Sequence, residues 1–239
     1  MTDVVTLTTA CVLGFIHALE IDHMLAVTAF VSRRPTLAMA ARFGFRWGVG
    51  HSVAVLAAGS LLLATGFRWS ERFDQLGEAL VGTMLIGIGA WALRSTRNLH
   101  IHRPDEHGDH LHVHTHGHGV EDHRHHHHHA GRSSAHRHGD PAPRGMSLVG
   151  MMHGLAGTTA VVALVPVTMV DRRLVGVAYL LAFGAGVTAA MTVFAAVSAV
   201  AMRQAAGRSL RIGRRISQSV GGLGIVTGAF WIWRAAAGG

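Results

Sequence analysis

The chain has 239 residues, of which 49% are hydrophobic and only 14% are charged, and it contains 30 glycines. This balance favours a membrane protein with several spans over a soluble domain. All 21 basic residues are arginine, so the chain lacks the lysine with which a P-loop contacts nucleotide phosphates. The arginines lie between apolar runs rather than on one basic face, so the net charge of +8 does not indicate nucleic-acid binding. A single cysteine, Cys11, excludes an intrachain disulfide framework.

Six apolar runs approach or exceed the length of about 20 residues that crosses a bilayer as a helix. They are 4–31, 45–66, 75–93, 147–170, 174–201 and 216–234. The runs do not alternate apolar and polar residues, as strands of a membrane barrel would. We therefore expect an all-α polytopic membrane protein with six transmembrane helices.

The first run contains HALEIDH, residues 17–23, in which two histidines and two acids interrupt an apolar stretch. On a straight helix His17, Glu20 and His23 lie within an arc of about 120°, whereas Asp22 points nearly the opposite way. Asp22 must therefore contact another helix, or the helix must be broken there. An acid at the middle of a bilayer costs about 2.5–3.5 kcal/mol, so these acids are expected to have partners.

Two further histidines are candidate partners. His51 lies in the second run, in WGVGHS, and His153 lies in the fourth, in MMHGLAG. Together with His23, they can place imidazoles from three helices at one depth. Imidazole with carboxylate suits nickel, cobalt, zinc or copper(II) rather than copper(I). The alternatives are a structural ion pair within the first run and, above all for His153, a packing histidine.

A different kind of sequence separates the third run from the fourth. Residues 100–138 contain 16 of the 20 histidines and no apolar period. Such a segment cannot bury enough surface to fold. We expect 94–146 to be a disordered, His-rich loop.

The flanking halves, 1–93 and 147–239, resemble each other. LGFIHAL at 13–19 matches VGMMHGL at 149–155, and 31 residues after each histidine comes GVG or GAG. Because each half has an odd number of spans, the second would be inserted upside down relative to the first. This predicts two inverted three-helix repeats with a substrate site where they meet. The glycines are close-packing positions for helices.

The placement of the arginines predicts the orientation. Sixteen of the 21 arginines fall in the loops that are internal if the N-terminus is outside. Because basic residues concentrate in cytoplasmic loops, we expect both termini outside and the His-rich loop in the cytoplasm. The expected location is the cytoplasmic (inner) membrane.

HALEIDH followed by WGVGHS resembles the nickel/cobalt transporter family, whose signature is His-Ala-x-Asp-x-Asp-His on one transmembrane helix and Gly-His-Ser/Thr on the next. MMHGLAGT is similar to the second-half element of its urease-accessory-type relatives, and the His-rich loop is like that of the efflux branch of the wider superfamily. The resemblance covers 14–56 and, more weakly, 149–191. It implies that His17, Asp22 and His23 form the metal signature with His51. Glu20 stands where the family has aspartate.

These observations predict a secondary transporter of Ni²⁺ or Co²⁺ rather than an enzyme. The predicted metal ligands are His17, Glu20, Asp22, His23, His51 and His153. The metal is the cargo, and no permanently bound cofactor is expected. The expected partners are a transition-metal cation and the lipid bilayer, with a cytoplasmic metallochaperone as a further candidate. The alternatives are a membrane-anchored metal store or sensor that acts through the loop, and an anion exporter with arginines at its site, against which the acids of the first span argue.

Overall fold

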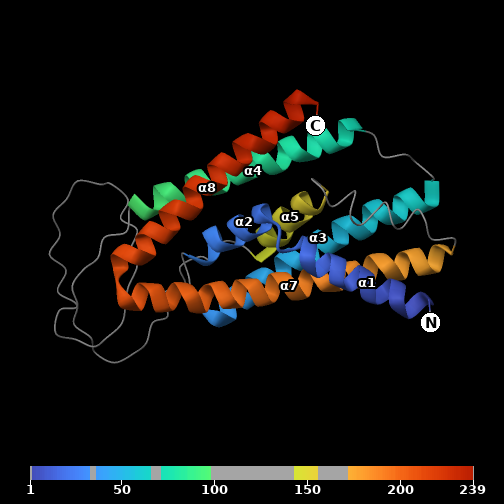
Figure 1. Ribbon diagram of the computed structural model, residues 1–239, viewed down its shortest axis with the longest axis horizontal. Coiled ribbons are helices and arrows are strands. Elements are labelled where there is room, and N and C mark those ends of the chain that lie inside the picture. The colour runs from blue at the N-terminus through green and yellow to red at the C-terminus, as the bar shows by residue number, and fades with distance from the viewer. Residues whose placement is uncertain (1, 33–35, 66–70, 98–142, 156–171, 239) are drawn as a thin grey trace.

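The regular structure is helical throughout the described residues. The computed structural model describes residues 2–32, 36–65, 71–97, 143–155 and 172–238 (Figure 1). The helices are α1 (Thr2–His17), α2 (Ile21–Val31), α3 (Leu37–Thr65), α4 (Glu71–Arg97), α5 (Pro143–Gly154), α7 (Arg173–Arg208) and α8 (Leu210–Ala237). The predicted all-α fold class is thereby confirmed.

Four helices, α3, α4, α7 and α8, are long and apolar enough to cross a membrane. Helices α1 and α2 pass the same test only as a pair, which is bent by 59°, so the described residues supply four spans, or five with this pair. The expected span 147–170 is described as helix only as far as Gly154, and its remainder lies outside the described residues. The chain is an all-α membrane protein, and the number six stays a prediction.

Several helices extend beyond the apolar runs from which they were predicted. Helix α3 begins at Leu37 rather than at 45, and α7 continues to Arg208 rather than ending at 201. The reason is that helical hydrogen bonds continue through polar and charged residues, so the end of an apolar run does not end the helix. Both ends of the predicted loop 94–146 are helical for the same reason, and its histidines lie outside the described residues.

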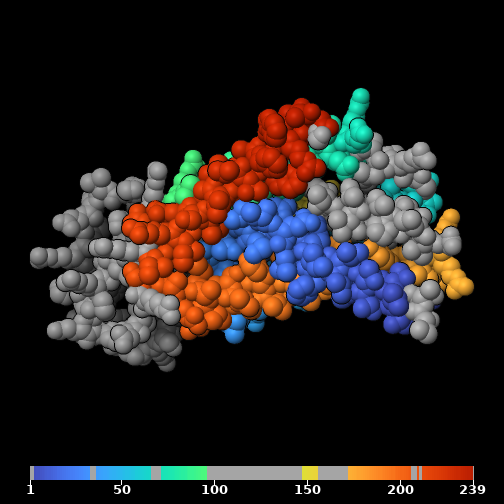
Figure 2. Space-filling model, in the orientation of Figure 1, coloured from blue at the N-terminus to red at the C-terminus, as the bar shows by residue number. Residues whose placement is uncertain are grey.

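The four long helices pack as two pairs, and the short helix α2 contacts both pairs. Helices α3 and α7 lie side by side, as do α4 and α8, while α1 packs on α7 and α5 packs on α3 (Figure 1). Helix α2 contacts α4, α7 and α8, and Figure 2 shows it filling the space between α7 and α8 on one face. Asp22 and His23, at the start of α2, are buried in this position.

The contact of α1 with α7 and the contact of α5 with α3 are built alike. Gly186 of α7 lies against the backbone of Cys11, and Gly50 of α3 lies against the backbone of Ser147, so that a Cβ at either glycine would collide with a carbonyl group. The two glycines are 136 residues apart, and so are Cys11 and Ser147. Equivalent residues of the two halves therefore make equivalent contacts with the opposite half.

The outer surface of the long helices is apolar. Large side chains such as Leu181, Val197, Val226 and Trp233 are more than half exposed. A soluble monomer rarely exposes so much contiguous apolar surface, whereas lipid solvates it. The exposed side chains thus agree with the apolar spans.

Candidate metal site

The membrane helix that carries HALEIDH is broken inside this motif. Helix α1 ends at His17, helix α2 begins at Ile21, and Glu20 adopts an extended conformation with φ −64° and ψ 152° before the second helix starts. After this bend of 59°, Asp22 and His23 are buried, whereas Ile21, the first residue of α2, stays exposed. Asp22, which a straight helix would direct away from His17 and His23, is therefore buried beside them. Of the two alternatives that the sequence left open for Asp22, a contact with another helix or a break in its own helix, the break is present.

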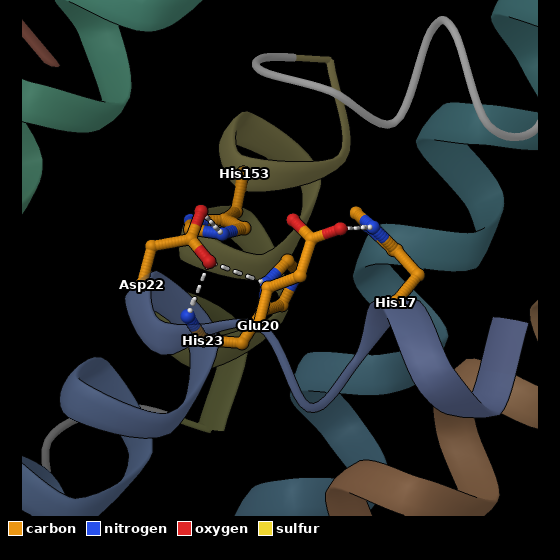
Figure 3. A network of polar contacts seen from close by, with 5 residues as sticks. All are labelled: His17, Glu20, Asp22, His23 and His153. Carbon is orange, nitrogen blue, oxygen red and sulfur yellow. Dashed lines mark hydrogen bonds and ion pairs between the residues drawn. The ribbon is translucent and has the colours of Figure 1, made fainter.

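Asp22 joins two helices through its two carboxylate oxygens (Figure 3). Its Oδ1 accepts a hydrogen bond of 2.8 Å from the backbone N–H of His23 and lies 3.0 Å from Nδ1 of the same residue. Its Oδ2 lies 3.2 Å from Nε2 of His153 on α5. Asp22 therefore has the second partner that the cost of a buried acid requires.

Glu20 makes a similar contact on the other side of the break. Its Oε1 lies 3.0 Å from Nδ1 of His17, which is fully buried, whereas 34% of the Glu20 side chain is exposed. A carboxylate that accepts the Nδ1 proton stabilises the tautomer whose Nε2 carries a lone pair. Glu20 can thus orient His17 from the edge of the site.

Four imidazoles from α1, α2, α3 and α5 converge on this point. The ring centroid of His23 lies 4.8 Å from that of His17, 5.3 Å from that of His51 and 4.1 Å from that of His153. Two groups have ligand atoms within 4.8 Å of one another, namely His17, His23 and His51, and Asp22, His23 and His153. His23 belongs to both groups, so the two share one side chain.

Several ring nitrogens at this point have no hydrogen-bond partner among the described residues. They are both nitrogens of His51, Nδ1 of His153 and Nε2 of His23, whereas Nε2 of His153 has its contact with Asp22. A buried polar atom without a hydrogen bond costs about 1–3 kcal/mol. A cation that accepted the lone pairs of neutral imidazoles would remove this cost, which a packing role for these histidines would leave unexplained.

The structure brings together five of the six predicted ligands in these two groups, and it places Glu20 beside His17 but in neither group.

Two aromatic residues next to the site were missed. Trp47 and Phe183 directly precede the matched GVG and GAG segments, and this repeated position was the signal that could have indicated them. An ion pair of 3.1 Å between Glu78 of α4 and Arg234 of α8 was also missed, although an acid in one apolar run and a base in another suggested it.

One known protein is similar to the chain along nearly its whole length. The urease accessory protein UreH of Bacillus sp. (strain TB-90) is 29% identical over 242 residues, which cover 95% of this chain and 95% of that protein. No family model matches the chain, and no solved structure matches it. The expected resemblance to urease-accessory-type relatives is confirmed, and it extends well beyond the two segments that first suggested it. The relative is named an accessory protein, in agreement with the expectation that this chain is not an enzyme.

Proposed function

We propose that this protein is a secondary transporter that carries Ni²⁺ or Co²⁺ across the cytoplasmic membrane. The observation that carries the proposal is the buried cluster of imidazoles and carboxylates at a break in a membrane helix, with unpartnered nitrogens aimed into one small region. Nitrogen and oxygen ligands suit a divalent ion of this class. Broken helices at ion sites recur among secondary transporters. The similar protein is named a urease accessory protein, which supports a role for this transporter in supplying metal to an enzyme.

The two ligand groups offer neighbouring positions for one ion. The first position has three imidazoles, from His17, His23 and His51, and the second has Asp22 and His153 with the same His23. An ion that kept His23 as a ligand would move between them by exchanging the other ligands. Such stepwise exchange avoids complete release of a dehydrated cation inside the membrane, which would be costly.

Protons compete with the metal for the same atoms. Imidazole nitrogens and carboxylate oxygens bind a cation only when they are deprotonated, so metal affinity falls as pH falls. Protonation of these atoms would therefore release the ion. A proton gradient is therefore the proposed driving force.

The test is flux of radioactive nickel and cobalt into membrane vesicles, measured with and without a pH gradient. His51→Ala should abolish the flux because it removes an imidazole that has no other partner among the described residues. Val53→Ala is the matched control, since Val53 is two residues along α3 and 48% exposed. Full flux in His51→Ala would refute a transport path through this site.

The alternative function, a metal store or sensor, is favoured by the 16 histidines in residues 100–138. The same vesicles distinguish the two functions. A store retains nickel in proportion to the histidines of the loop, independently of His51 and of the pH gradient. A transporter accumulates nickel in the lumen, from which a detergent releases it.

Inverted repeats and the predicted orientation are part of the proposal. The contacts that equivalent residues make with the opposite half support the repeats. The end of α4 and the turn between α7 and α8, both flanked by arginine, lie at the same end of the molecule (Figure 1). We place this end in the cytoplasm and the two termini outside.

A further inference from the structure

Two buried aromatic rings lie against two of the histidines. The ring of Phe183 on α7 lies 5.7 Å from that of His17, with an angle of 32° between the planes. The ring of Trp47 on α3 lies 5.8 Å from that of His153, with an angle of 55°. Both aromatic residues are 0% exposed. Each ring therefore closes one side of an imidazole.

The two contacts are one arrangement made twice. His17 and His153 are 136 residues apart, as are Trp47 and Phe183, and this is also the spacing across which Ser52 contacts Thr188. Each histidine of one half is thus covered by the aromatic residue of the other half. Chance packing of single rings would not reproduce this exchange.

A glycine three residues before each histidine makes the arrangement possible. Gly14 lies against the backbone of Phe183, and Gly150 lies against the backbone of Trp47. A Cβ at either glycine would collide with the carbonyl group of the aromatic residue, so alanine there would push the two helices apart. The short separation holds each ring against its histidine.

We propose that Phe183 and Trp47 are positioning residues, each of which holds a metal-binding histidine of the opposite half in place and keeps water from it. This inference rests on the proposed function for its metal. A ring packed against an imidazole limits the orientations of that imidazole, which lowers the entropy lost when the ion binds. The site is then complete only when the two halves are packed together.

The first test needs no metal. Full-length protein in membrane vesicles is treated with diethyl pyrocarbonate, and carbethoxylation of each histidine is measured by mass spectrometry of its peptide. We expect Phe183→Leu to increase the rate at His17 about tenfold and to leave His153 unchanged, and Trp47→Leu to do the reverse. Trp47→Phe, which restores a ring, should return the rate at His153 to that of the native protein. Phe194→Leu, a partly buried core position on α7, is the control and should change neither rate.

A merely structural role predicts another pattern, because general loosening would raise both rates in both variants. Equal effects on the two histidines, or no effect, overturn the inference. Should Phe183→Leu fail to insert, Phe183→Met keeps most of the volume without the ring and is judged by the same rates.

The second test measures nickel flux in the same variants. The half-saturating nickel concentration should rise about 10–100-fold in Phe183→Leu and Trp47→Leu, the range for residues that orient metal ligands. Maximal flux should change much less, and Trp47→Phe should restore the native concentration. The positioning role is overturned if each variant raises the carbethoxylation rate of its own histidine but the half-saturating nickel concentration stays unchanged. Flux that is independent of His51 in the native protein refutes the proposed function itself, whatever the carbethoxylation rates.

Discussion

Asp22 contacts two of the four histidines of the candidate metal site. It holds His23 through a backbone and a side-chain contact and approaches His153 on another helix. A single carboxylate therefore orients two imidazoles and supplies a negative charge that would offset half the charge of a divalent ion. For both reasons we expect substitution of Asp22 to weaken metal binding more than substitution of Glu20, which is partly exposed and contacts His17.

Asp22→Asn separates the charge from the hydrogen bonding. The amide oxygen can still accept the N–H of His23, so the turn should persist. The loss of charge should lower nickel affinity about 10–100-fold, the range for carboxylates that orient metal-ligating histidines. Equilibrium nickel binding by purified protein, with the loop contribution subtracted by means of the double variant His23→Ala and His51→Ala, measures the effect. Asp3→Asn, on the exposed first turn of α1, is the control. If Asp22→Asn bound nickel as tightly as the native protein, Asp22 would not be part of the metal site.

The break between α1 and α2 is the element on which the site depends. A continuous helix would leave Asp22 on the wrong face, and the helix ends at His17 and resumes at Ile21 instead. The first N–H groups of any helix have no intrahelical acceptor, so the beginning of α2 tolerates residues that a helix interior does not.

Ile21→Pro tests the break directly. Ile21 is the first residue of α2 and is 59% exposed, and the extended Glu20 has the conformation that a following proline favours. We expect the variant to insert, fold and transport nickel like the native protein. In an unbroken helix the same substitution would cost about 3 kcal/mol and bend the helix. Thr28→Pro, in the interior of α2, should abolish transport and serves as the contrasting variant. Loss of function in Ile21→Pro while Thr28→Pro remained active would contradict the described break.

The pair α4–α8 depends on glycines that allow backbone contact. A Cβ at Gly228 would lie 2.5 Å from the carbonyl oxygen of Gly82, and one at Gly221 would lie 3.0 Å from that of Gly89. Since apolar side chains gain little by leaving lipid, close backbone packing is what holds such helices together.

Two alanine substitutions on the same helix should therefore act in opposite directions. Gly228→Ala should lower the temperature of unfolding in detergent, because the new methyl group forces α4 and α8 apart. Gly222→Ala should leave it unchanged or raise it, because nothing lies within 4 Å of its Cβ and alanine stabilises a helix by about 0.4–1 kcal/mol relative to glycine. Thermal unfolding of both variants measures the difference. Equal effects would mean that this contact does not hold the pair.

At the scale of the whole molecule, the placement of the arginines predicts which ends of the helices face each side of the membrane. Thr36, before α3, and Glu71, at the start of α4, are both exposed. In a Cys11→Ala background, an impermeant maleimide added outside whole cells should label Glu71→Cys and spare Thr36→Cys. Permeabilised cells provide the control, because both variants should then react. The reverse pattern in intact cells would invert the proposed orientation.

The His-rich loop is predicted to act beside the transport path rather than within it. An ordinary histidine side chain has a pKa near 6.5, so at neutral pH most imidazoles of such a loop would be neutral and would bind metal weakly and release it quickly. Deletion of 100–138 should leave maximal nickel flux nearly intact and raise the half-saturating concentration. The difference between the two proteins should shrink as the pH on the loop side falls below about 6, because protonated imidazole binds no metal. Abolished flux at every nickel concentration, with the helices still inserted, would make the loop an obligatory part of the path.

The sequence by itself determined the class of the protein and indicated most of the candidate metal site. Apolar runs of sufficient length leave only a helical membrane protein, because lipid offers the backbone no other hydrogen-bond partners. Titratable residues inside such runs are costly, so His17, Asp22, His23 and His51 stood out without any structure. The matching halves were visible because the same glycine and histidine positions recur at the same spacing.

Only the tertiary structure decided how these residues meet. Helical periodicity describes one straight helix, so it could not show that the bend before Ile21 brings Asp22 to the histidines while Glu20 remains at the edge. It also could not show that His153 reaches Asp22, since their contact joins helices far apart in the chain. The aromatic rings behind the histidines were hidden for the same reason: an apolar residue in an apolar run carries no sign of its neighbour until the halves pack together.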